Sequence, residues 1–337
     1  MKPWVEQNLN LAGMCGTDRG LDVFILPHSN TWRPRGRQKK WTILHFRLQS
    51  VKTCDNLRAS NHALRAPSLP MFFKSLLTPI GAAQSFLARR RPAKGRIIVF
   101  CGAGLSAPSG LSVYRGSSGA WTLSPQAHAA MDFHNWPSSR PEALAHLAQW
   151  RKQALQCMPN DAHRRIAAWK KAWPESVSII TQNVDGLFQR AGLADSDVLE
   201  VHGSLHRMRC VDCGHEWPLP RGADNGLPCP ACGSAQTKPA VVFFNEPAPL
   251  YAKMSAICAP SERLPLDTLV SIGTSWQVIS PSTIFSTRGR AMGQQLSIDI
   301  RDQPELAPWI HASFSGGAIE GARWAEKRII QQWRDGS

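Results

Sequence analysis

The stretch that decides the fold is Ile97-Ile98-Val99-Phe100, which leads through Cys101 into Gly102-Ala103-Gly104-Leu105-Ser106. An apolar run followed at once by glycines predicts a buried parallel strand that ends in a tight turn and opens a helix. A turn of this kind aims free backbone N–H groups at a phosphate. The spacing is G-A-G-x-S and not the G-x-G-x-x-G of ordinary dehydrogenases. The pattern therefore predicts an NAD-type ligand without implying hydride transfer.

Short apolar strands and helical segments alternate from this point to the C-terminus. We expect strands at about 96–100, 177–181, 198–201, 269–272 and 296–300, and helices at about 141–156, 162–172 and 317–333. This alternation indicates an α/β fold, a Rossmann-like parallel sheet covered by helices on both faces. Residues 205–240 interrupt the alternation and are expected to form a small inserted module.

The basic character of the chain is concentrated in its first part. The 337 residues carry a formal net charge of +15, and residues 1–95 hold 16 of the 39 basic residues but only 4 of the 24 acidic ones. We therefore expect residues 1–70 to be a flexible basic extension. A nucleic-acid-binding arm and an organelle-targeting sequence are the alternatives. Met71 stands before an expected helix at 72–91 and is a second candidate for the start of the protein.

Residues 71–337 are expected to form the catalytic domain. The sequence contains no run of 18 apolar residues, so a membrane span is not expected. It also lacks a clear secretory signal, which favours the cytoplasm, with an organelle as the alternative if the basic extension is a targeting sequence.

Four of the nine cysteines form two pairs with metal-ligand spacing. Cys210 and Cys213 are followed, after fifteen residues, by Cys229 and Cys232. Two such knuckles close a tetrahedral zinc site, and four protein ligands leave no position for water. The predicted zinc is therefore structural. A redox role for the C-x-x-C pairs and a nucleic-acid-reading zinc ribbon are weaker alternatives, the latter because the module holds few basic residues. The other five cysteines are scattered, unlike a secreted disulfide framework.

Three polar segments follow predicted strands, where open α/β sheets bind their ligands. Gln182, Asn183 and Asp185 can hydrogen-bond a ribose and an amide, although a polar turn that caps a helix would look the same. His202 is a candidate general base because its pKa lies near working pH, although a histidine in this position is more often structural. The third segment, Gly273-Thr274-Ser275, offers small donors to a second phosphate or ribose.

The ordered set of these motifs resembles the sirtuin family of NAD-dependent protein deacylases over about residues 94–333. The set is made of Gly102-Ala103-Gly104-x-Ser106-x-x-Ser109-Gly110, Tyr114-Arg115-Gly116, Thr181-Gln182-Asn183-x-Asp185, His202-Gly203, the four cysteines and Gly273-Thr274-Ser275. No single motif is specific, but their combination is. The resemblance implies a Rossmann-like domain and a small domain, made of the zinc module and a helical part at about 117–172, with NAD and acyl-lysine entering between them.

Carried over residue by residue, the resemblance implies two sets of site residues. The cofactor set is Gly102, Ala103, Gly104, Ser106, Tyr114, Arg115, Gln182, Asn183, Asp185, Gly273, Thr274 and Ser275. The substrate set is Val241, Val242 and Phe243, which would pair with the peptide backbone as an added strand.

The implied reaction transfers the acyl group from a protein lysine to ADP-ribose. The acyl-lysine oxygen displaces nicotinamide from NAD, and His202 then takes a proton from a ribose hydroxyl. Asn183 and Asp185, which would line the nicotinamide and ribose pocket, are the other catalytic residues that the resemblance implies. The products are nicotinamide, lysine and O-acyl-ADP-ribose. An NAD hydrolase, an ADP-ribosyltransferase and a non-catalytic binding module remain as alternatives.

The chain departs from the family pattern at three places. The helical part lacks the Tyr and Arg that select acidic acyl groups, and Leu147 and Trp150 are the counterparts, with Arg151 next to them. This favours acetyl or another neutral acyl group. Asn245 replaces a glycine and is expected to keep the left-handed turn. Arg301 replaces an asparagine that contacts the nucleotide, which leaves that contact open or directs the arginine to a phosphate.

Overall fold

The computed structural model of the chain describes residues 10–17, 20–26, 95–113, 124–223, 225–259, 267–285 and 293–335. The chain divides into two units, residues 1–68 and 69–337. In the first unit the structure describes a hairpin of β1 (Asn10–Thr17) and β2 (Gly20–Leu26). This hairpin was not expected, although the run Val23-Phe24-Ile25 has high strand propensity. The expected helix at 72–91 lies outside the described residues.

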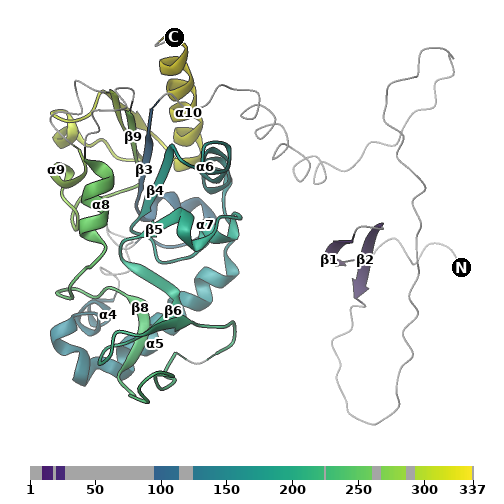
Figure 1. The fold of residues 1–337 in the computed structure, drawn as a ribbon, viewed down its shortest axis with the longest axis vertical. Helices are drawn as coiled ribbons and strands as arrows, with labels where there is room; N and C mark the ends of the chain where they lie inside the picture. Colours follow the sequence, from purple (N-terminus) through teal and green to yellow (C-terminus); the bar gives the residue numbers. More distant parts are fainter. Residues whose placement is uncertain are drawn as a thin grey trace, which may run out of the picture. The chain divides into compact units, whose positions relative to one another are not determined.

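A six-stranded sheet, parallel throughout, organises the second unit (Figure 1). Its strands, from edge to edge, are β11 (Ala312–Ser315), β10 (Gly293–Asp299), β9 (Asp267–Ile272), β3 (Ile97–Cys101), β4 (Val177–Thr181) and β5 (Val198–Glu200). The five expected strands are confirmed, with each end within three residues of the expected position, and β11 was not expected. The chain runs from β3 through β4 to β5 at one edge, and then from β9 through β10 to β11 at the other, so the switch point lies between the C-terminal ends of β3 and β9.

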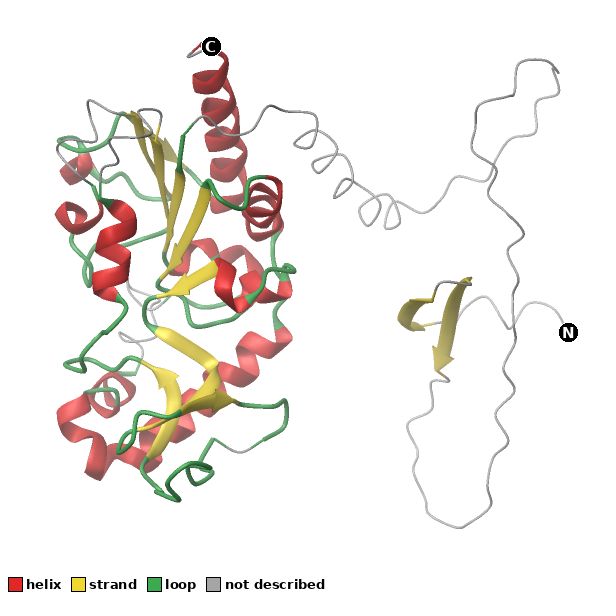
Figure 2. Ribbon diagram, viewed as in Figure 1, coloured by secondary structure: helices red, strands yellow, loops and turns green. Residues whose placement is uncertain are grey.

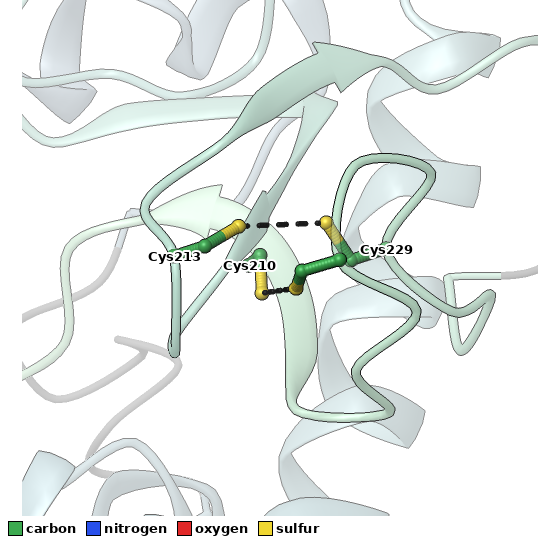
Figure 3. A group of neighbouring side chains, drawn as sticks. Cys210, Cys213 and Cys229 are labelled. Atoms are coloured by element: carbon green, nitrogen blue, oxygen red, sulfur yellow. Dashed lines mark hydrogen bonds between the residues drawn. The ribbon is translucent and has the colours of Figure 1, made fainter.

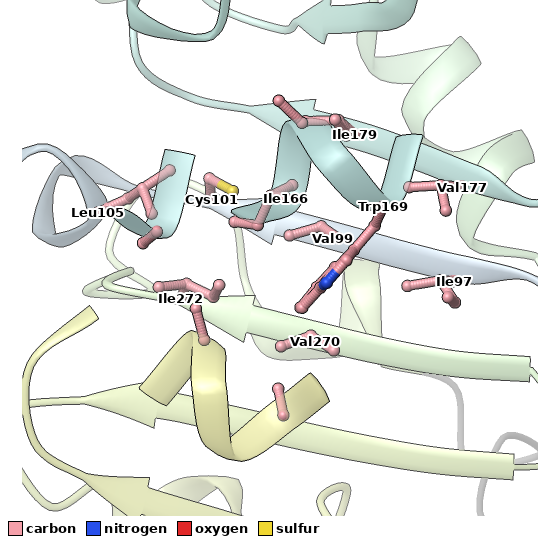
Figure 4. Packing of buried hydrophobic residues seen from close by; sticks show 14 of the residues in the cluster. Ile97, Val99, Cys101, Leu105, Ile166, Trp169, Val177, Ile179, Val270 and Ile272 are labelled. Carbon is pink, nitrogen blue, oxygen red and sulfur yellow. The ribbon is translucent and has the colours of Figure 1, made fainter. Parts of the chain in front are cut away.

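Helices cover both faces of the sheet (Figure 1). On one face, α6 (Asp161–Ala172) and α10 (Ala318–Asp335) enclose a core in which Trp169 lies against Val99 and Val270 (Figure 4). On the other face, α8 (Tyr251–Cys258) and α9 (Pro281–Ile284) pack over Phe100. The helix expected at 162–172 therefore packs on the sheet of the large domain. The helical insertion ends before this helix and not at residue 172, as was expected. None of the described helices is long and apolar enough to cross a membrane.

The small domain is built from two insertions (Figure 2). The first contains α4 (Pro125–Ala130) and α5 (Trp136–Gln156). The second is an antiparallel sheet of β6 (Gly203–Cys210), β7 (Glu216–Pro218) and β8 (Thr237–Val241). Their shared core is formed by Trp136 and Leu147 of α5 with Leu205 and Phe243 of the second insertion. The helix α5 begins five residues earlier than expected, because the buried Trp136 anchors an additional turn and Pro141 is accepted inside the helix.

Candidate functional site

The glycine-rich segment after β3 differs from the expected helix start. It forms two short 3-10 turns, Ala103–Leu105 and Ala107–Ser109. The N–H of Gly102 donates to Ile272 O at 2.9 Å and that of Gly104 donates to Gly273 O at 2.9 Å. The sequence pattern predicted that these amides would be free to bind a phosphate. In the structure both are used by backbone carbonyls instead.

Close packing between two loops explains why glycine is needed here. A Cβ atom on Gly102 would lie 2.5 Å from Gly273 O, and one on Gly104 would lie 2.6 Å from Gly273 Cα. Gly273 itself has a left-handed φ of 62°. The glycines thus let the loops after β3 and β9 meet at the switch point, and both loops line one cavity there.

This cavity, of about 480 Å³, lies at the C-terminal ends of the strands. It brings together most of the residues that the sequence singled out: Gly102, Ala103, Gly104, Gln182, Asn183, His202, Val241, Val242, Phe243, Gly273, Thr274 and Ser275. Polar groups from Gln182, Asn183 and Thr274 share it with the apolar side chains of Met131 and Trp150. Tyr114 and Arg115 lie outside the described residues.

Ser106 and Asp185 were expected to contact the cofactor, but they lie behind the residues that line the cavity. Both are buried, and neither is among the described residues that line the cavity. The Ser106 hydroxyl donates to Asp185 Oδ2 at 2.7 Å, and Asp185 Oδ1 accepts the N–H of Leu187 at 2.9 Å. Burial raises the pKa of Asp185, and these hydrogen bonds oppose the shift. The pair forms a layer beneath the cavity wall.

That layer fixes the orientation of Asn183. The Asn183 side-chain NH₂ donates to Gly102 O at 3.0 Å and to Ser106 Oγ at 3.1 Å. Since both amide hydrogens are taken, the side-chain carbonyl oxygen is the atom left for a ligand in the cavity. His163 on α6, 3.4 Å from Ser106 Oγ, completes this layer and was missed because only the fold brings it there.

His202 follows β5, and the geometry of its ring fits a general base. Nδ1 lies 3.1 Å from Gln182 O and Nε2 lies 2.8 Å from the hydroxyl of Tyr251. The carbonyl can only accept, so Nδ1 carries the proton and Nε2 is the basic nitrogen of the neutral ring. Burial lowers the pKa of His202, which keeps the ring neutral near pH 7. Tyr251 is a site residue that the sequence analysis missed.

The glycine after His202 allows the backbone of His202 to pack against the expected substrate segment. Gly203 has φ 81°, and a Cβ atom there would collide with the carbonyl oxygen of Ala240 on β8. The close approach lets Val242 N–H donate to His202 O at 2.9 Å. The base and the expected substrate strand are therefore joined by a backbone hydrogen bond.

The segment after β8 is held by a buried ion pair. Lys238 Nζ lies 3.0 Å from Glu246 Oε2, which also accepts the N–H of Phe243 at 2.8 Å. Between them, Asn245 keeps the expected left-handed conformation with φ 61°, and its side chain donates to Asp132 Oδ2 at 2.9 Å. The turn is thus tied to the helical insertion. The N–H and carbonyl of Phe244 pair with Met131 and Phe133, so they are already used within the protein.

Two arginines near the cavity have different environments. Arg151 is buried, and its guanidinium donates to the carbonyls of Leu219 and Pro220 in the zinc module. Arg301 lines the cavity and stays more than half exposed, with its Nε 3.2 Å from Asp299 Oδ1. Of the two, only Arg301 can meet a ligand in the cavity.

The four cysteines of the inserted module form a cluster (Figure 3). All four sulfur atoms lie within 4.8 Å of one another, with Cys210 and Cys232 3.6 Å apart and Cys213 and Cys229 3.7 Å apart. Zinc–sulfur bonds of about 2.3 Å in a tetrahedron require sulfur–sulfur distances of about 3.8 Å. The cluster therefore fits a zinc ion with four thiolate ligands, and a fully ligated zinc has no open position for water, which agrees with a structural role.

Comparison with known proteins agrees with the resemblance found in the sequence. The sequence model of the Sir2 family matches residues 102–280. An NAD-dependent protein deacylase of Thermus thermophilus is 34% identical over 232 residues, which cover 67% of this chain and 87% of the relative. An NAD-dependent protein deacetylase of Halalkalibacterium halodurans is 35% identical over 217 residues, covering 63% and 86%.

Solved structures show the same fold. A mutant Sir2 homologue in complex with ADP-ribose superimposes with a TM-score of 0.58 at 24% identity, covering 75% of this chain and 98% of the other. A second mutant, in complex with 2'-O-acetyl-ADP-ribose, has a TM-score of 0.55 at 26% identity and covers 74% and 97%. The sequence match, the relatives and the fold together show that the chain belongs to the Sir2 family, the sirtuins.

Proposed function

We propose that this protein uses NAD to remove neutral acyl groups, acetyl above all, from lysine side chains of proteins. The observation that carries the proposal is that one cavity holds both halves of the required site. Its polar end has the loops after β3 and β9 with Gln182 and Asn183, and its apolar side has Trp150, Val241 and Phe243, with His202 lining the same space. The curated relatives named above are deacylases and deacetylases of this kind.

The described residues fit an NAD molecule. The Gly102–Gly104 and Gly273–Ser275 loops would line the diphosphate and adenosine side, and Asn183, with its free amide oxygen, would face the nicotinamide side. Gln182 Nε2 donates to Thr274 Oγ1 at 3.0 Å, which links the two regions. When bound, NAD supplies a sugar carbon that carries nicotinamide as a leaving group.

The residues of this chain have three tasks in the reaction. The apolar wall excludes water and aligns the acyl-lysine arm, which raises the effective concentration of a weak nucleophile. Asn183 is oriented by the buried pair beneath it. His202 accepts a proton at Nε2, and Gln182 O holds the Nδ1–H of the imidazolium that results.

We base the preference for neutral acyl groups on where the Arg151 guanidinium is bound. Its guanidinium is used by carbonyls of the zinc module, and Leu147 is fully buried in the core, so neither offers a charge to the cavity. Trp150 is the member of this helical stretch that lines the cavity. Arg301, the arginine that lines the cavity, already has its Nε 3.2 Å from Asp299 Oδ1. At Trp150 the wall offers an acyl carboxylate no charged group to replace its hydration.

We expect a succinyl-lysine peptide to have a kcat/KM at least about 10-fold below that of the acetyl-lysine peptide, a difference of about 1.4 kcal/mol. Trp150→Arg should narrow this gap, because it adds a cation to the cavity wall, and Trp150→Gln serves as the uncharged control. Equal rates on the two peptides with the wild-type protein would contradict a neutral acyl site.

The pH dependence of turnover should report on His202. The base must be neutral, and its pKa is lowered by burial, so kcat/KM should rise with pH through a midpoint below about 6.5 and then stay level. The measurement is a pH–rate profile with acetyl-lysine peptide. A midpoint above this value, or the same acidic limb in the residual activity of His202→Ala, would show that another group controls the profile.

One assay separates the proposed function from its competitors. The purified protein is incubated with NAD, with and without acetyl-lysine peptide, and nicotinamide, peptide and nucleotide products are measured. Peptide-dependent nicotinamide release together with O-acetyl-ADP-ribose supports deacylation. Loss of NAD without peptide would favour an NAD hydrolase, ADP-ribose on protein would favour a transferase, and no turnover would favour a binding module.

A further inference from the structure

The basic nitrogen of His202 is already engaged by another side chain. Nδ1 donates to Gln182 O, so Nε2 accepts, and the hydroxyl 2.8 Å away on Tyr251 must be the donor. The nitrogen that has to take a proton during the reaction is therefore occupied by the proton of a phenol. A substrate hydroxyl reaches this nitrogen either after Tyr251 moves away or through its oxygen.

The place of Tyr251 favours the second route. It is the first residue of α8, and its N–H donates to Ala248 O at 3.1 Å. The same helix is anchored in the core by the buried Met254 and Cys258. Tyr251 is half-buried and lines the cavity together with His202 and Asn183. A hydroxyl held this way is available to a ligand without leaving its histidine.

The chemistry of a phenol permits both contacts at once. Its oxygen has two lone pairs, so it can accept a hydrogen bond from the cavity while it donates to Nε2. Burial raises the pKa of Tyr251 and lowers that of His202, so that the phenol keeps its proton and the imidazole stays free to receive one.

We propose that Tyr251 relays the proton from the reacting sugar hydroxyl of the substrate complex to His202. As the substrate O–H bond breaks, its proton bonds to Tyr251 Oη and the electron pair stays on the substrate oxygen. The former Tyr251 proton passes to His202 Nε2. Tyrosine ends neutral, and the positive charge rests on the imidazolium, held by Gln182 O. The inference rests on the proposed deacylation and adds a catalytic residue to it.

The first test reads the hydrogen bond without NAD. The protein is labelled with ¹⁵N-histidine, and the ring nitrogens of His202 are followed by NMR in the cofactor-free state above its pKa. We expect Nδ1 to be the protonated nitrogen and Nε2 to show the upfield shift of an acceptor. In Tyr251→Phe, Nε2 should move downfield by several ppm. A wild-type Nε2 that is protonated, or that does not respond to the substitution, would overturn the proposal.

The second test separates the proton step from the step before it. Because nicotinamide leaves before the base acts, Tyr251→Phe should keep exchange of labelled nicotinamide within about twofold while deacylated peptide forms at least about 10-fold more slowly. Ser255→Ala, which removes a hydroxyl from an exposed position of α8, should change neither rate. Unchanged or faster product formation by Tyr251→Phe would mean that the phenol only blocks the base.

Failure of the proposed function would look different. In that case the wild-type protein would not release nicotinamide in response to acetyl-lysine peptide, while the NMR signature would still report on the hydrogen bond. If the wild-type protein deacylates peptide but its Nε2 has no phenol partner, the function stands and the relay falls.

Discussion

Replacing His202 with alanine should lower the rate of deacylation by about 10²- to 10⁴-fold, the usual contribution of a general base. The imidazole offers the basic nitrogen that faces the cavity with a defined tautomer, fixed by Gln182 O. Water can enter the space left by the ring, but it lacks the basicity of a neutral imidazole. The measurement is the single-turnover rate of O-acetyl-ADP-ribose formation, which excludes product release from the result.

The same variant should remain folded and keep its zinc. His202 belongs to the cavity wall, whereas the thiol cluster is formed by residues 210–232 and its geometry does not involve the imidazole. We therefore expect about one zinc ion per chain and a thermal midpoint close to that of the wild type. His146→Ala, at a half-buried position of α5, is the matched control and should keep full activity. Wild-type turnover by His202→Ala would remove the histidine from the mechanism.

The sheet was predictable because short local runs of apolar and β-branched residues mark most of its strands. Four of the five residues of Val177–Thr181 are β-branched, and the observed strand has the expected bounds. The edge strand Ala312–Ser315 was missed because it is short, and its residues alternate between half-buried and exposed, with none fully buried. Similarly, the glycine segment after β3 predicts a phosphate loop by analogy, yet the backbone bonds to β9 that consume its amides depend on residues 170 positions away.

Within the site, the sequence predicted which residues gather there but not which of them line the cavity and which lie behind its wall. Motif order placed Ser106, Asn183 and Asp185 in one set, and only the fold shows that Asn183 faces the cavity while the other two support it from below. Tyr251 carries no local signal, because its role arises from a contact with a residue 49 positions away. Spacing in sequence predicts metal knuckles well, since both ligands of a knuckle are local, and predicts such long-range pairs poorly.

Replacing Cys210 with alanine should have the largest effect on the folded protein. Structural zinc contributes about 10–16 kcal/mol of apparent binding free energy in isolated zinc-finger peptides, which is comparable with the whole stability of a domain, about 5–15 kcal/mol. Cys210 is fully buried at the end of β6, and three sulfur ligands leave the module without its closed site. We expect zinc content to fall from about one ion per chain to near zero, with a much lower soluble yield.

The effect should reach the active site through the strand that leaves the module. β8 ends at Val241, and the next residues, Val242 and Phe243, line the cavity. The Val242 N–H also donates to the backbone carbonyl of His202. When the knuckles open, β6 and β8 lose their common support, so this wall of the cavity loses its shape and deacylation is lost with the metal. Cys157→Ser, a substitution at a half-buried thiol outside the cluster, should leave zinc content and activity intact. Cys210→Ala protein that is active, cooperative in unfolding and free of zinc would show that the metal is not needed to hold the fold.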